Sequence, residues 1–291
     1  MLAQQIVNGL VVGSIYALSA LGFTLIFGAA RIVNFAYGEL LMLGAFFTVT
    51  AMAVFGLSFF AALPIGIMAT SALSVLMFVL TIRPLTRKSY VSLKGELQVI
   101  LVTLGLLYIL RESALMIWGS APRRVDMGVS GIILIGDVVI AKQRLVVMFI
   151  MSLMVGLLYW LLYKTRIGLA LRAIAQNRDG AAAIGLDGDR IISFVFAMSG
   201  ALACVAGSLI GSLYAVEPSM GGAPLLKAFV IVIFGGLGSV PGAIVGGLLI
   251  GLIETLAGAY IGFAFKDIFM FLLLIGMLLL RPNGLFGTTV R

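Results

Sequence analysis

Apolar runs of about twenty residues, the length that crosses a bilayer as a helix, follow one another along most of this chain. Only short polar breaks separate them. Inside the hydrocarbon core a helix satisfies its own backbone hydrogen bonds, which makes it the natural form for such runs. Of the 291 residues, 62% are hydrophobic and 10% are charged, and the mean hydropathy is +1.23. This composition excludes a soluble domain and predicts an all-α fold, a polytopic transmembrane helical bundle.

We expect about eight or nine spans, one of them a short or re-entrant half-helix, in a single transmembrane domain over residues 1–291. The start, MLAQQ, lacks the basic region of a signal peptide, so the first span is expected to be retained. The expected helical segments are residues 6–27, 34–55, 59–82, 97–118, 145–163, 191–214, 225–234, 242–261 and 269–280.

The formal charge of +8 reports orientation rather than nucleic-acid binding. The basic residues form no stripe with interleaved aromatic residues but cluster at the ends of apolar runs. Cys204 is the only cysteine and histidine is absent, so the sequence offers no disulfide framework, no CxxC motif and no thiolate cluster for a metal. It also contains no GxxxxGK[ST] motif, so we expect no ATP-binding P-loop in this chain.

The longest stretch that a bilayer does not hold is residues 164–190, which we call the knob. Asp179 is expected to cap a short Ala-rich helix, Gly185 to end it in a left-handed turn, and Asp187 or Asp189 to cap the next helix. Two interpretations stay open: a solvated loop that only sets topology, or a docking surface for a cytoplasmic partner. The positive-inside rule places the knob in the cytoplasm because of its five basic residues, Lys164, Arg166, Arg172, Arg178 and Arg190.

A second basic loop, which contains Arg83, Arg87, Lys88 and Lys94, is expected on the same side as the knob. Between them, residues 119–143 are expected to form a small outer hairpin of two short strands around Gly136 and Asp137. Its own basic residues count against the outer side, but a single span on each flank requires that side. These residues are Arg123, Arg124 and Lys142.

The apolar segment 225–234 is too short to cross the membrane, because about ten helical residues cover roughly 15 Å. It ends in the run GGLGSVPGA. Irregular backbone at membrane depth is tolerated only where protein buries it or it lines a wet cavity. We expect nine crossings and an outer N-terminus if the half-helix reaches the cytoplasm, and eight crossings and an inner N-terminus if it returns; we favour nine.

Small residues recur at the spacing that lets helices approach closely. Gly9 and Gly13 mark one such face on the first span. The span 242–261 has two, one with Gly242 and Gly246 and the other with Gly247 and Gly251. We therefore expect this span to pack closely on two neighbours.

Ionisable and polar residues within apolar runs are candidates for function. Glu39 enters the second span with Asn34 and is either an interfacial residue at its cytoplasmic end or a functional carboxylate. Glu254 lies deep in its span and is either functional or bonded to a neighbouring helix. The adjacent Arg111 and Glu112 point to different sides of a helix, so Arg111 either snorkels to the outer interface or belongs to a polar pathway.

Four stretches carry a resemblance to a known family. They read NFAYGELLMLGAFF from Asn34, RAIAQNRDGAAAIGLDGDRI in the knob, IVIFGGLGSVPGAIVGGLLIGLIETL, and KDIFMFLLLIGMLLLRPNGLFG near the end. In this order, and over nearly the whole chain, they resemble the branched-chain amino-acid ABC permeases of the LivH subtype. The family's first motif usually has His where Tyr37 stands here, which puts any role of a titrating imidazole in doubt.

The resemblance implies a multi-pass subunit of an ATP-driven importer for branched-chain, hydrophobic amino acids in the bacterial inner membrane. Implied partners are a second, LivM-like permease, two cytoplasmic ATPase subunits and a periplasmic amino-acid-binding protein; neither a cofactor nor a metal is implied. The knob resembles the family's coupling helix, which sits in a cleft of the ATPase. The corresponding positions are Arg172, Ala173, Ala181, Ala182 and Gly185, with Asp179 as the expected helix cap.

We assign the translocation path to residues at the breaks and within the spans, with helix packing as the alternative role for the Gly-rich turn. Two other functions stay open. One is a urea or short-amide permease of the same family; the other is an ion-coupled secondary transporter in which Glu39, Arg111 and Glu254 form a relay. The residues assigned to the path are Asn34, Glu39, Gly235, Gly236, Gly238, Pro241 and Glu254.

A zwitterionic amino acid held firmly in the membrane needs a fixed cation and a fixed anion, both desolvated at a cost. Glu254 is a candidate for the anion, and Arg111 is the basic residue that we place within a span. We therefore expect no tight substrate site in this chain, with selectivity coming from a separate binding protein.

Overall fold

The computed structural model describes residues 2–85, 93–135, 138–262, 265–281 and 283–287. Seven helical segments of this part are long and apolar enough to cross a membrane. They are α1 (Leu2–Ala30), α2 (Tyr37–Phe55), α3 (Phe59–Met77) continued by the π-helix η1 (Phe78–Ile82), α5 (Leu93–Trp118), α6 (Lys142–Lys164), α9 (Gly188–Leu213) and α11 (Val240–Tyr260). Two shorter apolar helices, α10 (Gly222–Gly235) and α12 (Lys266–Leu280), complete the bundle, which confirms the predicted fold class.

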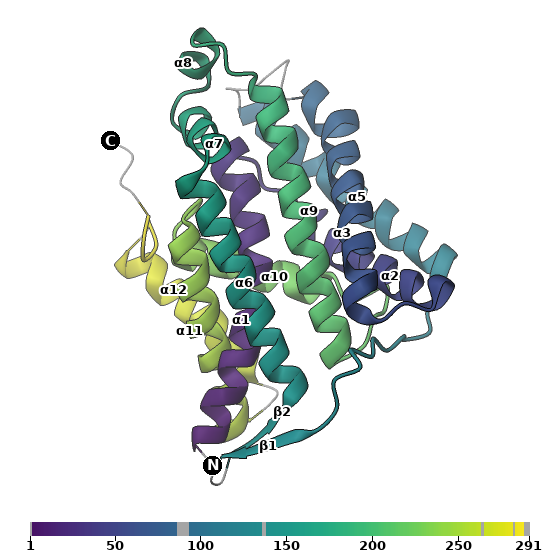
Figure 1. Ribbon diagram of the computed structural model, residues 1–291. Helices are drawn as coiled ribbons and strands as arrows, with labels where there is room; N and C mark the ends of the chain where they lie inside the picture. Colours follow the sequence, from purple (N-terminus) through teal and green to yellow (C-terminus); the bar gives the residue numbers. More distant parts are fainter. Residues whose placement is uncertain (1, 86–92, 136–137, 263–264, 282, 288–291) are drawn as a thin grey trace.

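Helix α1 lies at the centre of the bundle and packs against α6, α9, α10 and α11 (Figure 1). Its contact with α11 is made by backbone, as the glycine spacing predicted. A side chain at Gly251 would overlap the backbone of Gly13, and a β-carbon at Gly247 would lie 2.5 Å from the Cα of Ala17. The other glycine face of α11 lies on α10, where Gly242 abuts Gly235.

Two helices start inside the bundle. Helix α1 ends at Ala30, Arg31 adopts a left-handed φ of 51°, and the chain turns back, so that Tyr37 packs on Gly22, about 12 Å inside the end of α1. Helix α2 therefore begins at depth. The loop before α10 also enters the bundle, because a β-carbon on Gly38 would lie 2.6 Å from the Gly221 carbonyl oxygen.

The buried start of α2 changes the interpretation of Glu39. Glu39 is only 2% exposed and lies two residues after Tyr37, among the most deeply buried residues of the bundle. This burial argues against the interfacial residue, one of the two interpretations left open for Glu39, and a functional role for its carboxylate stays a prediction.

The knob and the hairpin lie at opposite ends of the bundle (Figure 1). Strands β1 (Ile132–Ile135) and β2 (Val138–Ala141) pair antiparallel as predicted, and the expected turn at Gly136 and Asp137 falls outside the described residues. Gln4 donates to the Val139 carbonyl at 2.9 Å, which puts the start of α1 at the hairpin end. An N-terminus at the same end as the hairpin is the arrangement expected for nine crossings.

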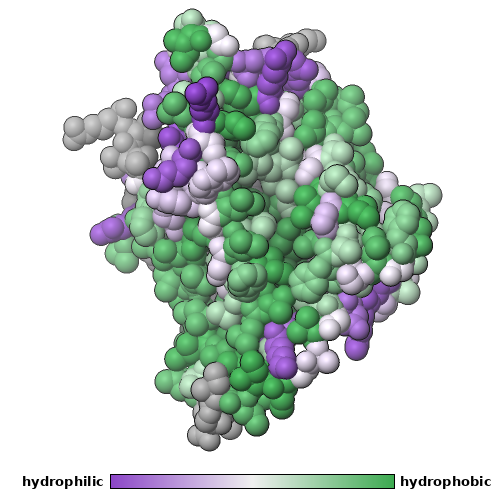
Figure 2. Space-filling view, viewed as in Figure 1, coloured by the Kyte–Doolittle hydropathy of each residue, from purple (hydrophilic) through white to green (hydrophobic). Residues whose placement is uncertain are grey.

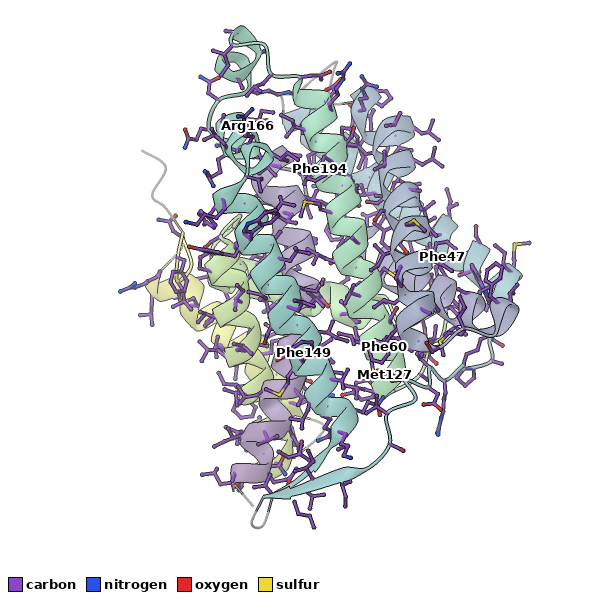
Figure 3. All side chains as sticks on the ribbon, viewed as in Figure 1. Phe47, Phe60, Met127, Phe149, Arg166 and Phe194 are labelled. Carbon is purple, nitrogen blue, oxygen red and sulfur yellow. The ribbon has the colours of Figure 1, made fainter. Side chains whose placement is uncertain are left out.

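The surface agrees with a membrane environment. In Figure 2, a broad hydrophobic belt separates hydrophilic residues at the knob end from smaller hydrophilic patches toward the other end. Figure 3 shows Phe149 on the side of the bundle, where it is exposed, and Arg166 at the knob end. Exposed apolar side chains along the helices are suited to contact with lipid or with a second membrane subunit.

The arrangement of the two ends predicts which of them a membrane-impermeant thiol reagent labels in intact cells. In a Cys204→Ala background, Leu134→Cys on β1 should be labelled, and Ile184→Cys on the knob should react only after the membrane is opened. Both side chains are exposed, so accessibility is set by the membrane. Labelling of the Ile184→Cys site alone in intact cells would contradict this orientation.

Candidate functional site

The knob consists of two helices, α7 (Arg166–Gln176) and α8 (Arg178–Ala183), and the turn that leads into α9. Asn177 caps α8, because its side-chain oxygen accepts from the Gly180 amide at 2.9 Å. The prediction that Asp179 caps this helix is wrong. Asn177 has the extended backbone of a cap residue (φ −151°, ψ 109°), whereas Asp179 already lies within the helix.

The end of the knob follows the prediction. Gly185 has a φ of 85°, and the amide of Leu186 donates to the Ala181 carbonyl at 3.0 Å, which closes the helix end. Asp187 then caps α9 by accepting from the amides of Asp189 and Arg190 at 3.1 and 3.2 Å. Asp189, the alternative cap, has a different role.

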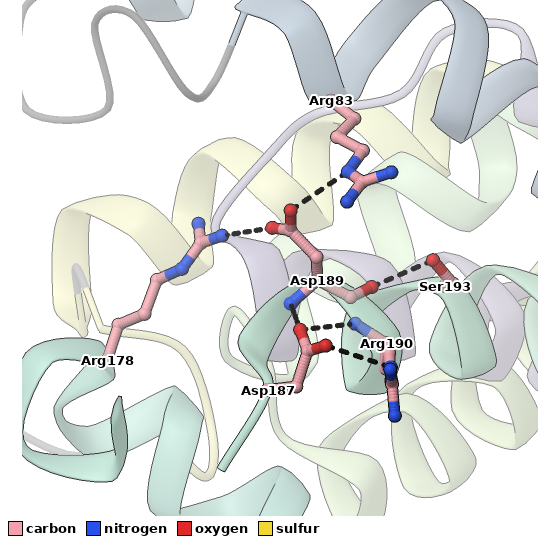
Figure 4. Close-up of polar contacts among 6 residues, drawn as sticks. All are labelled: Arg83, Arg178, Asp187, Asp189, Arg190 and Ser193. Carbon is pink, nitrogen blue, oxygen red and sulfur yellow. Dashed lines mark hydrogen bonds and ion pairs between the residues drawn. The ribbon is translucent and has the colours of Figure 1, made fainter. Parts of the chain in front are cut away.

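The Asp189 carboxylate joins three parts of the knob end (Figure 4). Its Oδ2 accepts from Arg83 Nε at 2.8 Å, and its Oδ1 accepts from Arg178 Nη2 at 2.8 Å. Arg83 follows η1, Arg178 opens α8 and Asp189 is in the first turn of α9. The knob is thereby tied to the end of the third span and not only to the helices that precede and follow it.

Arg172 fixes α7 to the end of α6. Its guanidinium donates to the Leu162 carbonyl and lies over the Tyr163 ring, with 5.3 Å between Cζ and the ring centroid. Ala173 is half-buried beside it. Arg172 therefore holds the knob in place, which adds a structural role to the one that the resemblance implies.

The tip of the knob presents small and apolar side chains to the exterior. Ile184 is 76% exposed, and Ala182 and Gly185 are exposed, while Ala181 is buried beneath them. An apolar tip held on a rigid base is suited to insertion into a cleft of another protein.

The Gly-rich turn lies next to the knob. Gly238 and Pro241, together with Arg172, line an inner cavity of about 400 Å³ at the knob end of α1. Gly235 is packed against Gly242, and Gly236 has a φ of 104°. The turn thus combines close backbone packing with a place at the wall of a cavity.

The predicted polar residues at the start of α2 are buried. Asn34 uses its Oδ1 to accept from the Ala36 amide at 3.1 Å. Asn34 Nδ2 and Glu39 Oε2 have no hydrogen-bond partner among the described residues. Arg111 and Glu112 lie on an exposed face of α5, so Arg111 is not part of a buried pathway within the described chain.

A second cavity, of about 660 Å³, extends from Gln5 and Glu217 at the hairpin end toward Glu254; we call it the outer cavity. Inside it Lys227 Nζ donates to Glu254 Oε1 at 2.6 Å and to the Tyr16 hydroxyl at 2.5 Å. Lys266 Nζ lies 3.4 Å from the same Glu254 oxygen. Four helices, α1, α10, α11 and α12, thus contribute to one charged cluster.

Lys227 was not among the residues predicted from the sequence. Arg111 was predicted as the basic residue within a span, but Lys227 lies in α10 with its side chain only 12% exposed. The average hydropathy of an apolar segment conceals a single lysine. A residue-by-residue search of that segment for ionisable groups would have found it.

These features define a class of protein. A membrane-spanning helical bundle has a cavity at each end, a charged cluster within one of them and a helical protrusion at the other end. This is the architecture of a membrane transport protein.

Comparison with known proteins identifies the family. The chain belongs to the family described as “Branched-chain amino acid transport system / permease component”, whose model matches residues 5–278. It is 33% identical to the high-affinity branched-chain amino acid transport system permease protein BraD of Pseudomonas aeruginosa, over 98% of this chain and 95% of the relative. LivH of Escherichia coli K12 is 32% identical with the same coverage, and a probable LivH of Methanocaldococcus jannaschii is 30% identical over 98% and 92%.

The backbone at Gly236 predicts a test of the packing role of the Gly-rich turn. A β-carbon at Gly236 would lie 2.5 Å from the Gly287 amide nitrogen, in addition to the strain of its φ. We expect Gly236→Ala to lower the stability of the purified protein by roughly 1–3 kcal/mol, seen as a lower thermal unfolding midpoint in detergent.

Gly156→Ala is the matched control, because nothing lies within 4 Å of the added methyl group and alanine favours the helix. Its midpoint should stay level or rise slightly. A Gly236→Ala protein of unchanged stability that has lost uptake would contradict the packing role and favour a gate.

Proposed function

We propose that this chain is the membrane-spanning permease subunit of an ATP-driven ABC importer for branched-chain amino acids in the inner, or plasma, membrane. In this role it forms half of the translocation pathway. The observation that carries the proposal is the knob: an exposed apolar tip on a base that Asp189 ties to the third span and Arg172 to α6. Such an element is suited to transmit a conformational change from a partner subunit to the membrane helices.

The substrate class rests on the relatives. Their names specify branched-chain amino acids, and the matches extend over nearly the whole of each chain. A urea or short-amide permease has no comparable support. An ion-coupled relay through Glu39, Arg111 and Glu254 has less, because Arg111 lies on the exposed face of α5.

The proposed partners are inferred from the missing P-loop and from the exposed knob. Its sequence has no P-loop, so ATP hydrolysis belongs to two cytoplasmic ATPase subunits that dock on the knobs of this chain and of a second, LivM-like permease. A periplasmic binding protein delivers the amino acid to the hairpin end. The coupling contacts are those of the knob, with Ala182, Ile184 and Gly185 at the tip.

We assign the translocation path to the two cavities. The outer cavity contains Glu254, and the inner cavity has Gly238 and Pro241 in its wall. Helix α10 connects them, because Lys227 lines the outer cavity and the turn after the helix lines the inner one. Asn34 and Glu39 remain candidates for the same path through their unpaired buried atoms.

Purification of the tagged chain from its native host tests the partners. We expect co-purification of a second permease and an ATPase, and ATP-dependent uptake of leucine by the reconstituted complex once the binding protein is added. Uptake of urea but not leucine would show that the substrate is a short amide and not a branched-chain amino acid. Leucine uptake by the chain alone, driven by an ion gradient, would overturn the ABC assignment.

A proline at Ala182 tests the coupling role of the knob. The ring removes a helical hydrogen bond and clashes with the preceding turn, at a cost of about 3 kcal/mol to α8, while the membrane spans are unaffected. We expect normal insertion but at least a tenfold loss of ATP-driven leucine uptake in the reconstituted complex. Ala182→Ser, which preserves the helix, is the control and should retain uptake. Normal uptake by Ala182→Pro would reduce the knob to a topology signal.

A further inference from the structure

The charged cluster of the outer cavity is not needed to hold its helices together. Helices α10 and α11 already meet through Gly235 and Gly242, and α1 and α11 through Gly13 and Gly251. Burying an ion pair in such an environment is costly, and an apolar pair of similar size would fill the space at lower cost. The cluster therefore calls for a functional explanation.

The charges of the cluster are balanced and shared. Glu254 Oε1 is 2.6 Å from Lys227 Nζ and 3.4 Å from Lys266 Nζ, and Asp267 lies 3.8 Å from Lys227. The Glu254 side chain is only 6% exposed, yet its second oxygen, Oε2, has no hydrogen-bond partner among the described residues. Glu254 can thus release one cation without being left unpaired, and it has an acceptor available.

Most of the remaining residues of the cavity wall are apolar, although Gln5, Glu217 and Thr255 also line it. The cavity has room for a small molecule, since about 660 Å³ falls in the range of small-molecule sites. A ligand that complements this wall has a head with charges of both signs and a hydrocarbon body. The apolar lining includes Val12, Ile15, Ile210, Met220 and Pro224.

We propose that the outer cavity is a transient site for the zwitterion of an apolar amino acid, which inserts into the Lys227–Glu254 ion pair. The substrate carboxylate replaces Glu254 at Lys227 and at the Tyr16 hydroxyl. The substrate ammonium takes the unpaired oxygen of Glu254, while Lys266 stays beside that carboxylate. One ion pair becomes two, and the net charge of the cavity is unchanged throughout.

This exchange accounts for weak binding. The ligand must displace an existing 2.6 Å ion pair before it gains its own, so the contacts it makes are largely offset by those it breaks. We expect half-saturation at millimolar rather than micromolar leucine. The absence of a tight site in this chain stays a prediction, although its premise, that a fixed cation is lacking, was wrong.

The inference rests on the proposed function for its substrate class, but its test does not require transport. The permease–ATPase complex, without binding protein, is reconstituted in nanodiscs in a Cys204→Ala background with Ala223→Cys. Ala223 is exposed in the outer cavity, one helical turn before Lys227. Leucine at millimolar concentration should slow labelling of this thiol several-fold. It should leave unaffected a thiol at Leu134→Cys on β1, which is exposed and does not line the cavity.

Two analogues test recognition of both charges without changing the protein. 4-Methylpentanoate lacks the ammonium and 3-methylbutylamine lacks the carboxylate, so each should need at least tenfold higher concentration than leucine to give the same protection. Glu254→Gln and Lys227→Gln should shift the leucine curve at least tenfold. The control Glu112→Gln, on the exposed face of α5, should leave it in place.

Equal protection by leucine and both analogues would overturn the proposal, because the cavity would then recognise only the hydrocarbon body. An unshifted leucine curve for Glu254→Gln would overturn it too. Absence of protection in a complex that imports leucine would reject this site and leave the proposed function intact. A complex that imports no branched-chain amino acid but does import another substrate would reject the proposed function instead. The analogue comparison decides the matter even if the charge variants do not fold.

Discussion

Backbone contact between α1 and α11 is the interaction on which the arrangement depends. In a bilayer the hydrophobic effect does not drive helices together, so close approach through small residues takes its place. Gly13, Gly247 and Gly251 let the two helices touch. The contact fixes Tyr16 and Glu254 on neighbouring helices of one cavity, where Lys227 reaches both. The charged cluster is thus a consequence of how closely two helices pack.

The second constraint comes from helices that start within the bundle. Helix α2 begins beside Gly22 of α1, and the segment before α10 contacts Gly38 at the start of α2. Because α10 does not extend to the hairpin end, the outer cavity reaches inward as far as Lys227. At its other end α10 passes into the Gly-rich turn of the inner cavity. One short helix and the turn that follows it therefore link the two cavities.

Patterns that repeat along the sequence predicted the fold better than single residues did. Hydropathy predicted the helices, and glycine spacing predicted both contact faces of α11. The cap of α8 was misplaced because Asn177 and Asp179 are equally suited to capping and only the backbone decides between them. The buried start of α2 depends on tertiary contact with Gly22, which no local pattern encodes. Lys227 is visible in the sequence, but the mean hydropathy of its segment is apolar and conceals a single lysine.

The contacts of the knob continue into the cavities. Arg172 both binds the end of α6 and lines the inner cavity, opposite Gly238 and Pro241. The turn that contains these two residues connects α10 to α11, and these helices carry Lys227 and Glu254. Under the proposed function, we expect a displacement of α7 to act on the inner cavity directly and on the charged cluster through α10 and α11. Because closely packed helices shift as units rather than deform, such a path suits the opening of one cavity as the other closes.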